Sequence, residues 1–112
     1  MSLNNRLDVI LKSVADEANR VLGDKLDAVV LYGSYARGDY DDESDIDIMI
    51  RIDCPIESLE DYGEAFDLIS SRLSLENGIT VSIILRDKET FFRYKNALPF
   101  FSNIEKEGVK IA

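Results

Sequence analysis

Residues 31–50 read LYGSYARGDYDDESDIDIMI and join two strand-like segments. Asp27–Tyr32 is a short, apolar, β-branched run, which predicts a buried strand. Residues 33–44 are small, polar and acidic, which predicts a turn and a loop, with one helical turn near Ala36. In Ser44–Asp53 isoleucine recurs at every second position, so this segment predicts a strand with one face against a core and the other face open.

The segments on either side of this region alternate between helical and extended patterns. Apolar residues at helical spacing predict an amphipathic helix over Leu3–Leu22, which Gly23 ends, and another from Ile56 to about Leu75. After the turn at Asn77-Gly78, Ile79–Leu85 alternates again and predicts a third strand.

The last part of the chain predicts two further helices and an edge strand. Asp87 can cap the first of these helices, which is rich in aromatic residues. The second begins at Pro99, a residue suited to the first turn of a helix, and ends at Gly108. Val109–Ile111 predicts the edge strand. The interleaved helices and strands, with no linker or repeat between them, indicate one α/β (α+β) domain with a helix-covered face and a more open face.

The composition excludes several classes of function. The 112 residues include 22 acidic and 13 basic side chains, a formal net charge of −9, which argues against capture of nucleic acid or an anionic membrane, since both need a basic face. There is no histidine, so Ser-His-Asp and Cys-His catalysis and histidine zinc sites are excluded. The single cysteine, Cys54, cannot form an internal disulfide. With no apolar span or signal peptide, these features predict a soluble, cytoplasmic protein.

Asp45 and Asp47 are the first candidates for a functional site. They stand two residues apart on a predicted strand, so both side chains leave its open face, with Cα atoms about 7 Å apart. Two like charges at that spacing are unfavourable unless a cation lies between them, and Mg²⁺ prefers aspartate oxygens together with substrate phosphates. Taken alone, the pattern is also that of two solvated carboxylates on an exposed strand.

Gly33 and Ser34 lie where the first predicted strand ends and the turn opens. A glycine has no Cβ and lets the backbone approach a ligand closely, and the amides after it, with the Ser34 hydroxyl, can surround phosphate oxygens. Arg37, three residues further on, can reach an anion with its guanidinium. A plain tight turn with a serine cap would contain the same residues.

Together these residues form the pattern G-S-x₁₀-D-x-D, which resembles the signature of the polymerase-β-type nucleotidyltransferase superfamily. The strings GSYARG from position 33 and SDID from position 44, and the tail over residues 92–109, resemble the minimal nucleotidyltransferase (MNT) domains. These are small cytoplasmic domains, often paired with a HEPN-domain protein as antitoxin and toxin. The resemblance implies a single nucleotidyltransferase domain over residues 1–112, with a two-layer, palm-like fold, a mixed sheet and helices mainly on one face.

The resemblance also implies a role for each residue of the pattern. Gly33 and Ser34 would hold the β- and γ-phosphates of a nucleoside triphosphate, and Arg37 would support the triphosphate. Asp45 and Asp47 would be the catalytic carboxylates that bind Mg²⁺. The reaction would be attack of an acceptor hydroxyl on the α-phosphate with release of pyrophosphate. The nucleotide would be ATP, and the acceptor a tyrosine of a HEPN toxin.

The sequence departs from the family pattern at Ser82. Active members carry a third acidic residue on a later strand, and Ser82 is the residue that this pattern places beside Asp45 and Asp47. A serine supplies no fixed negative charge and is a poor general base. Two hypotheses therefore stand beside transfer to a protein hydroxyl. One is an antitoxin of weak or no activity that acts by binding its partner; the other, less favoured, is a modifier of small molecules.

The remaining aromatic and acidic residues have simpler interpretations. Tyr35 and Tyr40 are expected as surface aromatics that could stack on a base. The acidic residues 39–43 are expected as a solvated loop. The four phenylalanines of the last two predicted helices are expected as core or homodimer contacts, and they are Phe91, Phe92, Phe100 and Phe101.

Overall fold

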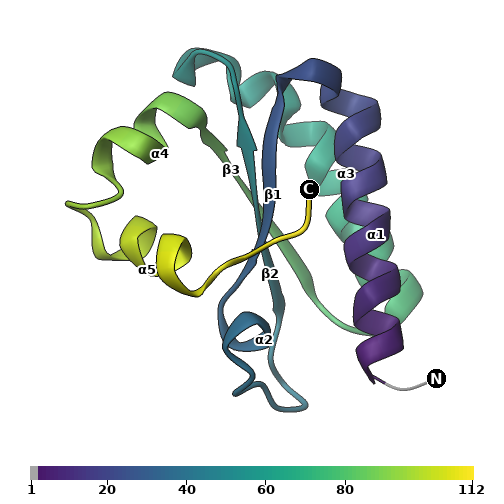
Figure 1. Cartoon of the computed structure of the whole chain (residues 1–112). Coiled ribbons are helices and arrows are strands. Elements are labelled where there is room, and N and C mark those ends of the chain that lie inside the picture. The colour runs from purple at the N-terminus through teal and green to yellow at the C-terminus, as the bar shows by residue number, and fades with distance from the viewer. Residues whose placement is uncertain (1–2) are drawn as a thin grey trace.

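A mixed four-stranded sheet lies at the centre of the fold in the computed structural model, which describes residues 3–112 (Figure 1). Its strands are β1 (Leu26–Tyr32), β2 (Ile46–Ile52), β3 (Val81–Asp87) and β4 (Val109–Lys110). They are ordered β3-β2-β1-β4 across the sheet. β1 runs antiparallel to β2 and to β4, whereas β2 and β3 run parallel, so the expected mixed sheet is confirmed.

Two long helices cover one face of this sheet. α1 (Leu3–Leu22) and α3 (Glu60–Asn77) lie on the same side of it in Figure 1. The alternating isoleucines of β2, from Ile46 to Ile52, face this layer and are at most 1% exposed. Burial of these β-branched side chains on one face is what fixes the register of the strand. None of the helices in residues 3–112 is long and apolar enough to cross a membrane.

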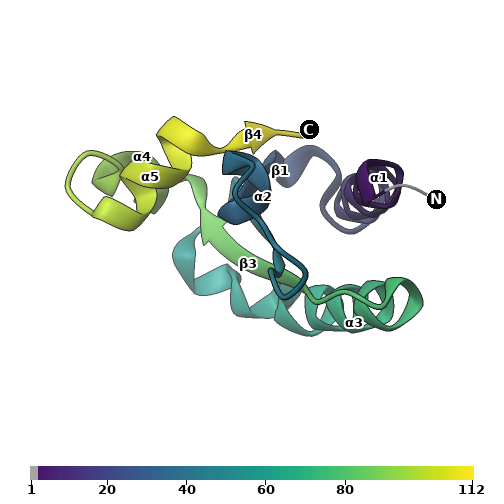
Figure 2. The same ribbon diagram turned by 90° about the horizontal axis from the view of Figure 1, so that it is seen from below.

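The opposite face is covered by two shorter helices, α4 (Lys88–Tyr94) and α5 (Pro99–Glu107), shown beside the sheet in Figures 1 and 2. Alternation places Met49 on the open face with Asp45 and Asp47, but Met49 is completely buried. It lies beneath the side chains of α4 and α5. The open face is therefore restricted to the beginning of β2, which contains Asp47 and directly follows Asp45. The second buried cluster consists of Ala28, Val30, Met49, Phe91, Phe101 and Ile104.

The connections form at the predicted turns. A 3-10 turn, η1 (Gly23–Lys25), follows α1, and α2 (Ser34–Arg37) is the expected helical turn between β1 and β2. A further 3-10 turn, η2 (Ile56–Ser58), precedes α3. The Thr90 amide donates to Oδ2 of Asp87 over 2.9 Å, which confirms Asp87 as the cap of α4.

The third strand begins at Val81, two residues after its predicted start. There the Ser74 hydroxyl accepts from the Val81 amide over 2.9 Å, and the Ser70 hydroxyl donates to the Val81 carbonyl. These two serines of α3 satisfy the backbone at the outer edge of the sheet. They also fix where the strand enters it.

Candidate active site

Gly33 and Asp47 lie in contact at the junction of β1, β2 and α2. Gly33 has φ 74° and ψ −155°, a backbone conformation that is essentially restricted to glycine. A Cβ at this position would collide with Oδ2 of Asp47 and lie 3.3 Å from its Cγ. The close approach that this glycine permits within the chain is therefore that of the Asp47 carboxylate. The turn predicted to hold phosphate and the carboxylate predicted to bind metal adjoin each other.

The turn after Gly33 is a single helical turn held by its backbone. The Gly33 carbonyl accepts from the amides of Ala36 and Arg37, both over 3.1 Å, and the Ser34 carbonyl accepts from the Gly38 amide over 2.9 Å. Gly38 ends the turn with φ 86°. The amides of Ser34 and Tyr35 come first in the turn, where helical amides have no intrahelical acceptor. They and the Ser34 hydroxyl are the donors that an oxyanion could use.

Asp47 lies beside Ser82 of β3 and Tyr32 of β1 in the sheet register. Burial raises the pKa of Asp47, and the charge of Asp45 raises it further, whereas Arg37 acts in the opposite direction. Asp45 is exposed and directly precedes β2. The charged form of Asp47 is therefore less favoured than that of an ordinary aspartate, and a nearby cation would favour it.

The carboxylates of Asp45 and Asp47 fit a cation that is bound jointly by the protein and by a phosphate-containing substrate. In residues 3–112 no three histidine, cysteine, aspartate or glutamate side chains are grouped so as to hold a metal ion. Asp45 and Asp47 offer carboxylate oxygens, and Mg²⁺ is commonly bound by one or two carboxylates together with substrate phosphates and water. The two aspartates can thus hold Mg²⁺ when phosphate oxygens complete its coordination.

The register confirms that Ser82 is the residue of β3 directly beside Asp47. Because paired residues of adjacent strands project from the same face, Ser82 has the position that the sequence pattern assigns to a third acidic residue. Its side chain is half-buried and carries no charge. Ser82 therefore adds no third carboxylate beside Asp47.

Arg37 is exposed and makes two ion pairs beside the turn. Its Nε lies 3.2 Å from Oδ2 of Asp39, and its Nη1 lies 3.4 Å from Oε2 of Glu107, the last residue of α5. The hydrogen bond to Asp39 is the main cause that raises the pKa of Arg37, and Glu107 adds to it. The guanidinium thus links the turn to α5 and stays close enough to Asp47 to favour its ionised form.

An open pocket of about 320 Å³ adjoins the turn, between β1 and α5. Tyr32, Gly33 and Arg37 form one side, and Phe100, Asn103 and Glu107 of α5 form the other. The sequence motif contains none of these α5 residues. Because these α5 residues are three and four positions apart, the sequence predicts that they share one face of a helix. It does not predict that this face lies next to Gly33.

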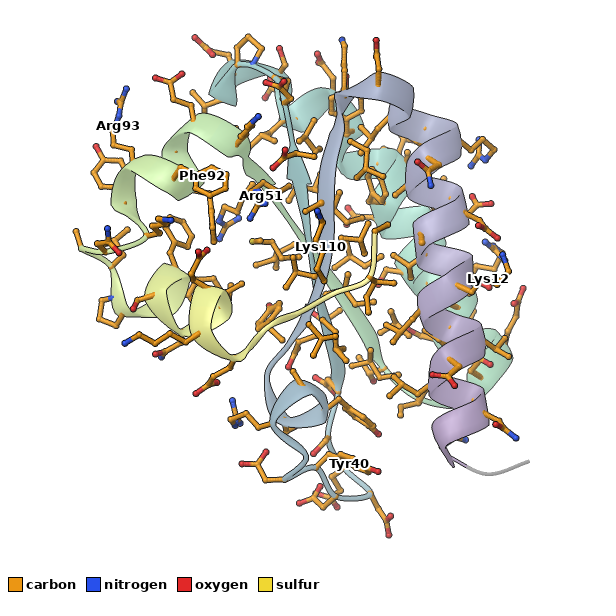
Figure 3. The ribbon with its side chains drawn as sticks, in the orientation of Figure 1. Lys12, Tyr40, Arg51, Phe92, Arg93 and Lys110 are labelled. Atoms are coloured by element: carbon orange, nitrogen blue, oxygen red, sulfur yellow. The ribbon has the colours of Figure 1, made fainter. Side chains whose placement is uncertain are left out.

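Tyr35 and Tyr40 stack on each other and are not both surface aromatics. Their rings lie 4.3 Å apart with an interplanar angle of 7°, and Tyr35 is only 7% exposed. Figure 3 shows Tyr40 on the loop between α2 and β2. The expectation for Tyr35 was wrong, because its ring belongs to the buried core cluster, and the Tyr40 ring packs on it. The stacked pair anchors the loop, whose acidic residues 39 and 41–43 are exposed as predicted.

Two solved structures share this fold. A chain from "Crystal structure of the toxin-antitoxin with AMP-PNP" has a TM-score of 0.62 at 16% identity, covering 91% of this chain and 72% of that one. A chain from "Crystal structure of a putative nucleotidyltransferase from Sulfolobus solfataricus" has a TM-score of 0.56 at 26% identity, covering 95% of this chain and 78% of that one. These similarities confirm the predicted nucleotidyltransferase fold.

Sequence similarity extends over nearly the whole chain. The family described as "Nucleotidyltransferase domain" matches residues 10–111. "Putative protein adenylyltransferase MJ0141" of Methanocaldococcus jannaschii is 36% identical over 104 residues, covering 91% of this chain and 95% of that protein. "Putative protein adenylyltransferase MJ0604" of the same organism is 37% identical over 84 residues, covering 75% and 76%. The chain therefore belongs to the nucleotidyltransferase domain family.

Proposed function

We propose that this member of the nucleotidyltransferase domain family transfers AMP from ATP, with Mg²⁺, to a hydroxyl of a protein, and that the acceptor is a tyrosine of a HEPN-type toxin. The observation that carries the proposal is the contact between Gly33 and Asp47. It brings donors suited to phosphate next to carboxylates suited to Mg²⁺. The names of the similar Methanocaldococcus proteins support adenylyl transfer to protein, and the toxin-antitoxin structure with AMP-PNP supports a nucleotide and a toxin partner.

Each residue of the site has a role in this reaction. The amides of Ser34 and Tyr35 and the Ser34 hydroxyl hold the β- and γ-phosphates, with Arg37 supporting them. Asp45 and Asp47 hold Mg²⁺, which when bound neutralises charge on the phosphates. The acceptor oxygen forms a bond to the α-phosphorus as the bond from that phosphorus to the bridging oxygen breaks. Pyrophosphate leaves, and the hydroxyl proton passes to solvent. Positioning and electrostatics dominate such phosphoryl chemistry.

Ser82 supports one alternative function. If transfer requires a third carboxylate, the chain binds ATP and Mg²⁺ but neutralises its partner by contact alone. The two functions predict different behaviour of Ser82→Asp. This substitution places a carboxylate beside Asp47, and a general base is typically worth roughly 10²–10⁴ in rate.

The experiment measures label incorporated into a co-purified HEPN partner from ATP labelled in its α-phosphate. The wild type should label the partner, and Asp47→Asn should not. Asp53→Asn is the matched control, since Asp53 is an exposed aspartate beyond the other end of β2. A wild type that labels the partner briskly, with no gain from Ser82→Asp, would show that two carboxylates suffice. Two outcomes would support the binding-only function. In one, the wild type does not label the partner but Ser82→Asp does. In the other, neither protein labels the partner, but both still neutralise it.

A further inference from the structure

The pocket between β1 and α5 has a composition unlike that of the phosphate turn beside it. Phe100 is 44% exposed at its edge, although it is apolar. Tyr32 meets Phe100 edge to face, with ring centroids 5.7 Å apart and an interplanar angle of 87°. An accessible aromatic surface of this kind next to a polar site is what a flat, uncharged group can stack on.

The polar residues at the rim of the pocket indicate whether a charged or an uncharged group can bind there. Glu107 is acidic and is paired with Arg37, which lines the pocket at its boundary with the turn. Arg37, the cation among these lining residues, is already paired with Asp39 and Glu107, so the pocket wall favours an uncharged group over an anion. Asn103 offers an amide that both donates and accepts hydrogen bonds, as the edge of a nucleobase does.

From this juxtaposition we infer that the pocket formed by Tyr32, Phe100 and Asn103 binds the nucleoside of the substrate triphosphate. The inference rests on the proposed function, because the phosphates must lie on the turn for the sugar and base to extend into the pocket. Gly33 belongs both to the turn and to the pocket wall, so the two ends of one nucleotide can occupy them together. The pocket volume of about 320 Å³ lies within the range usual for small-ligand sites.

Comparison of two ligands tests this assignment separately from the proposed function. ATP contains a nucleoside and a triphosphate, whereas inorganic tripolyphosphate contains only the phosphates. Their affinities are measured by calorimetry with Mg²⁺ for the wild type, Phe100→Ala and Asn103→Ala. Phe92→Ala is the matched control, because Phe92 is a phenylalanine of similar exposure, 40%, on α4 outside the pocket.

Phe100→Ala should weaken ATP binding by roughly tenfold or more, the usual effect of losing a stacked base, and leave tripolyphosphate binding unchanged. Asn103→Ala should change the ratio of ATP to GTP affinity. Because Asn103 is exposed, this variant tests the pocket even if Phe100→Ala fails to fold. Unchanged ATP affinity in both variants overturns the inference, and slower transfer at unchanged affinity would assign the pocket to the acceptor instead. If the wild type binds neither ligand, the proposed function fails and the inference fails with it.

Discussion

The contact between Gly33 and Asp47 makes the position of the Asp47 carboxylate depend on the backbone conformation of Gly33. Gly33 requires a positive φ, and its missing side chain leaves the space in which the Asp47 carboxylate lies. A position that is strained for every other residue persists only when the surrounding structure determines it. Here the register of the sheet sets the contact, because Asp47 pairs with Tyr32, the last residue of β1, and Gly33 directly follows it.

Gly33→Ala should therefore unfold more easily and lose the response to ATP with Mg²⁺. The new Cβ collides with Oδ2 of Asp47, and the backbone conformation adds a cost of about 1–3 kcal/mol. Gly38→Ala is the control, since Gly38 also has a positive φ but a Cβ there would meet nothing within 4 Å. It should lose some stability, about 1–2 kcal/mol, and keep ligand binding. Equal ATP affinity in both folded variants, measured by calorimetry, would contradict this account.

Asp47 should destabilise the protein at neutral pH when no metal is present. Burial, and then Asp45, raise its folded-state pKa above the ordinary value of 3.8. Between the unfolded and folded pKa values the folded state binds more protons, so the free energy of unfolding falls as pH rises through that interval. The destabilisation is complete above the folded pKa and absent below the unfolded one.

Asp47→Asn should consequently be more stable than the wild type at pH 7 in EDTA. The advantage should shrink as the pH approaches 3.8 from above and vanish below it. Denaturant unfolding at a series of pH values measures this difference. An asparagine variant less stable than the wild type at pH 7 would mean that the Asp47 carboxylate makes net favourable contacts in the metal-free fold.

At the scale of elements, α5 is the part that completes the site. Its last residue, Glu107, pairs with Arg37 of α2, and Gly108 brings the end of the helix close to β1. A Cβ at Gly108 would lie 2.5 Å from the Ile104 carbonyl oxygen and 2.6 Å from Cγ1 of Val30. The packing of α5 on the sheet therefore determines the distance across the pocket.

Glu107→Gln should tighten ATP binding by a few fold. The substitution removes a carboxylate that competes with phosphate for Arg37 and lowers the negative charge beside the site. The gain should diminish at high salt, because the groups are exposed and screened. Glu105→Gln is the matched control on the same helix, since Glu105 pairs with Lys95 rather than Arg37. A salt-independent change, or the same change in both variants, would rule out competition for Arg37.

For the whole molecule, local patterns predicted most of the fold. Alternating isoleucines predicted the buried face of β2, and Asp87 and Gly23 marked ends of helices. The G-S-x₁₀-D-x-D spacing made Gly33 and Asp47 candidates, and the structure brings these two residues together. The burial of Met49 and Tyr35 was not predictable in this way. Met49 is covered by α4 and α5, which come later in the chain. Tyr35 belongs to the core cluster that includes residues of α1, and Tyr40 stacks on it.

The pocket has the same non-local origin. Phe100 and Asn103 are more than sixty positions beyond Gly33 in the chain, and only the return of α5 over the sheet brings them together. Hydrophobic periodicity predicts that a helix exists, not which end of a sheet it covers. The motif could therefore indicate candidate residues for phosphate and metal, while the residues proposed to contact the nucleoside required the tertiary structure.

The central claim is that Asp47, beside the Gly33 turn, makes a joint site for Mg²⁺ and a nucleoside triphosphate. The most direct test is the melting temperature with ATP, in Mg²⁺ and in EDTA, for the wild type, Asp47→Asn and the control Asp53→Asn. Because a ligand stabilises the state that binds it, ATP with Mg²⁺ should raise the melting temperature of the wild type and of Asp53→Asn, and EDTA should remove the rise. Asp47→Asn should fold and show no rise. An equal rise in Asp47→Asn would contradict the claim.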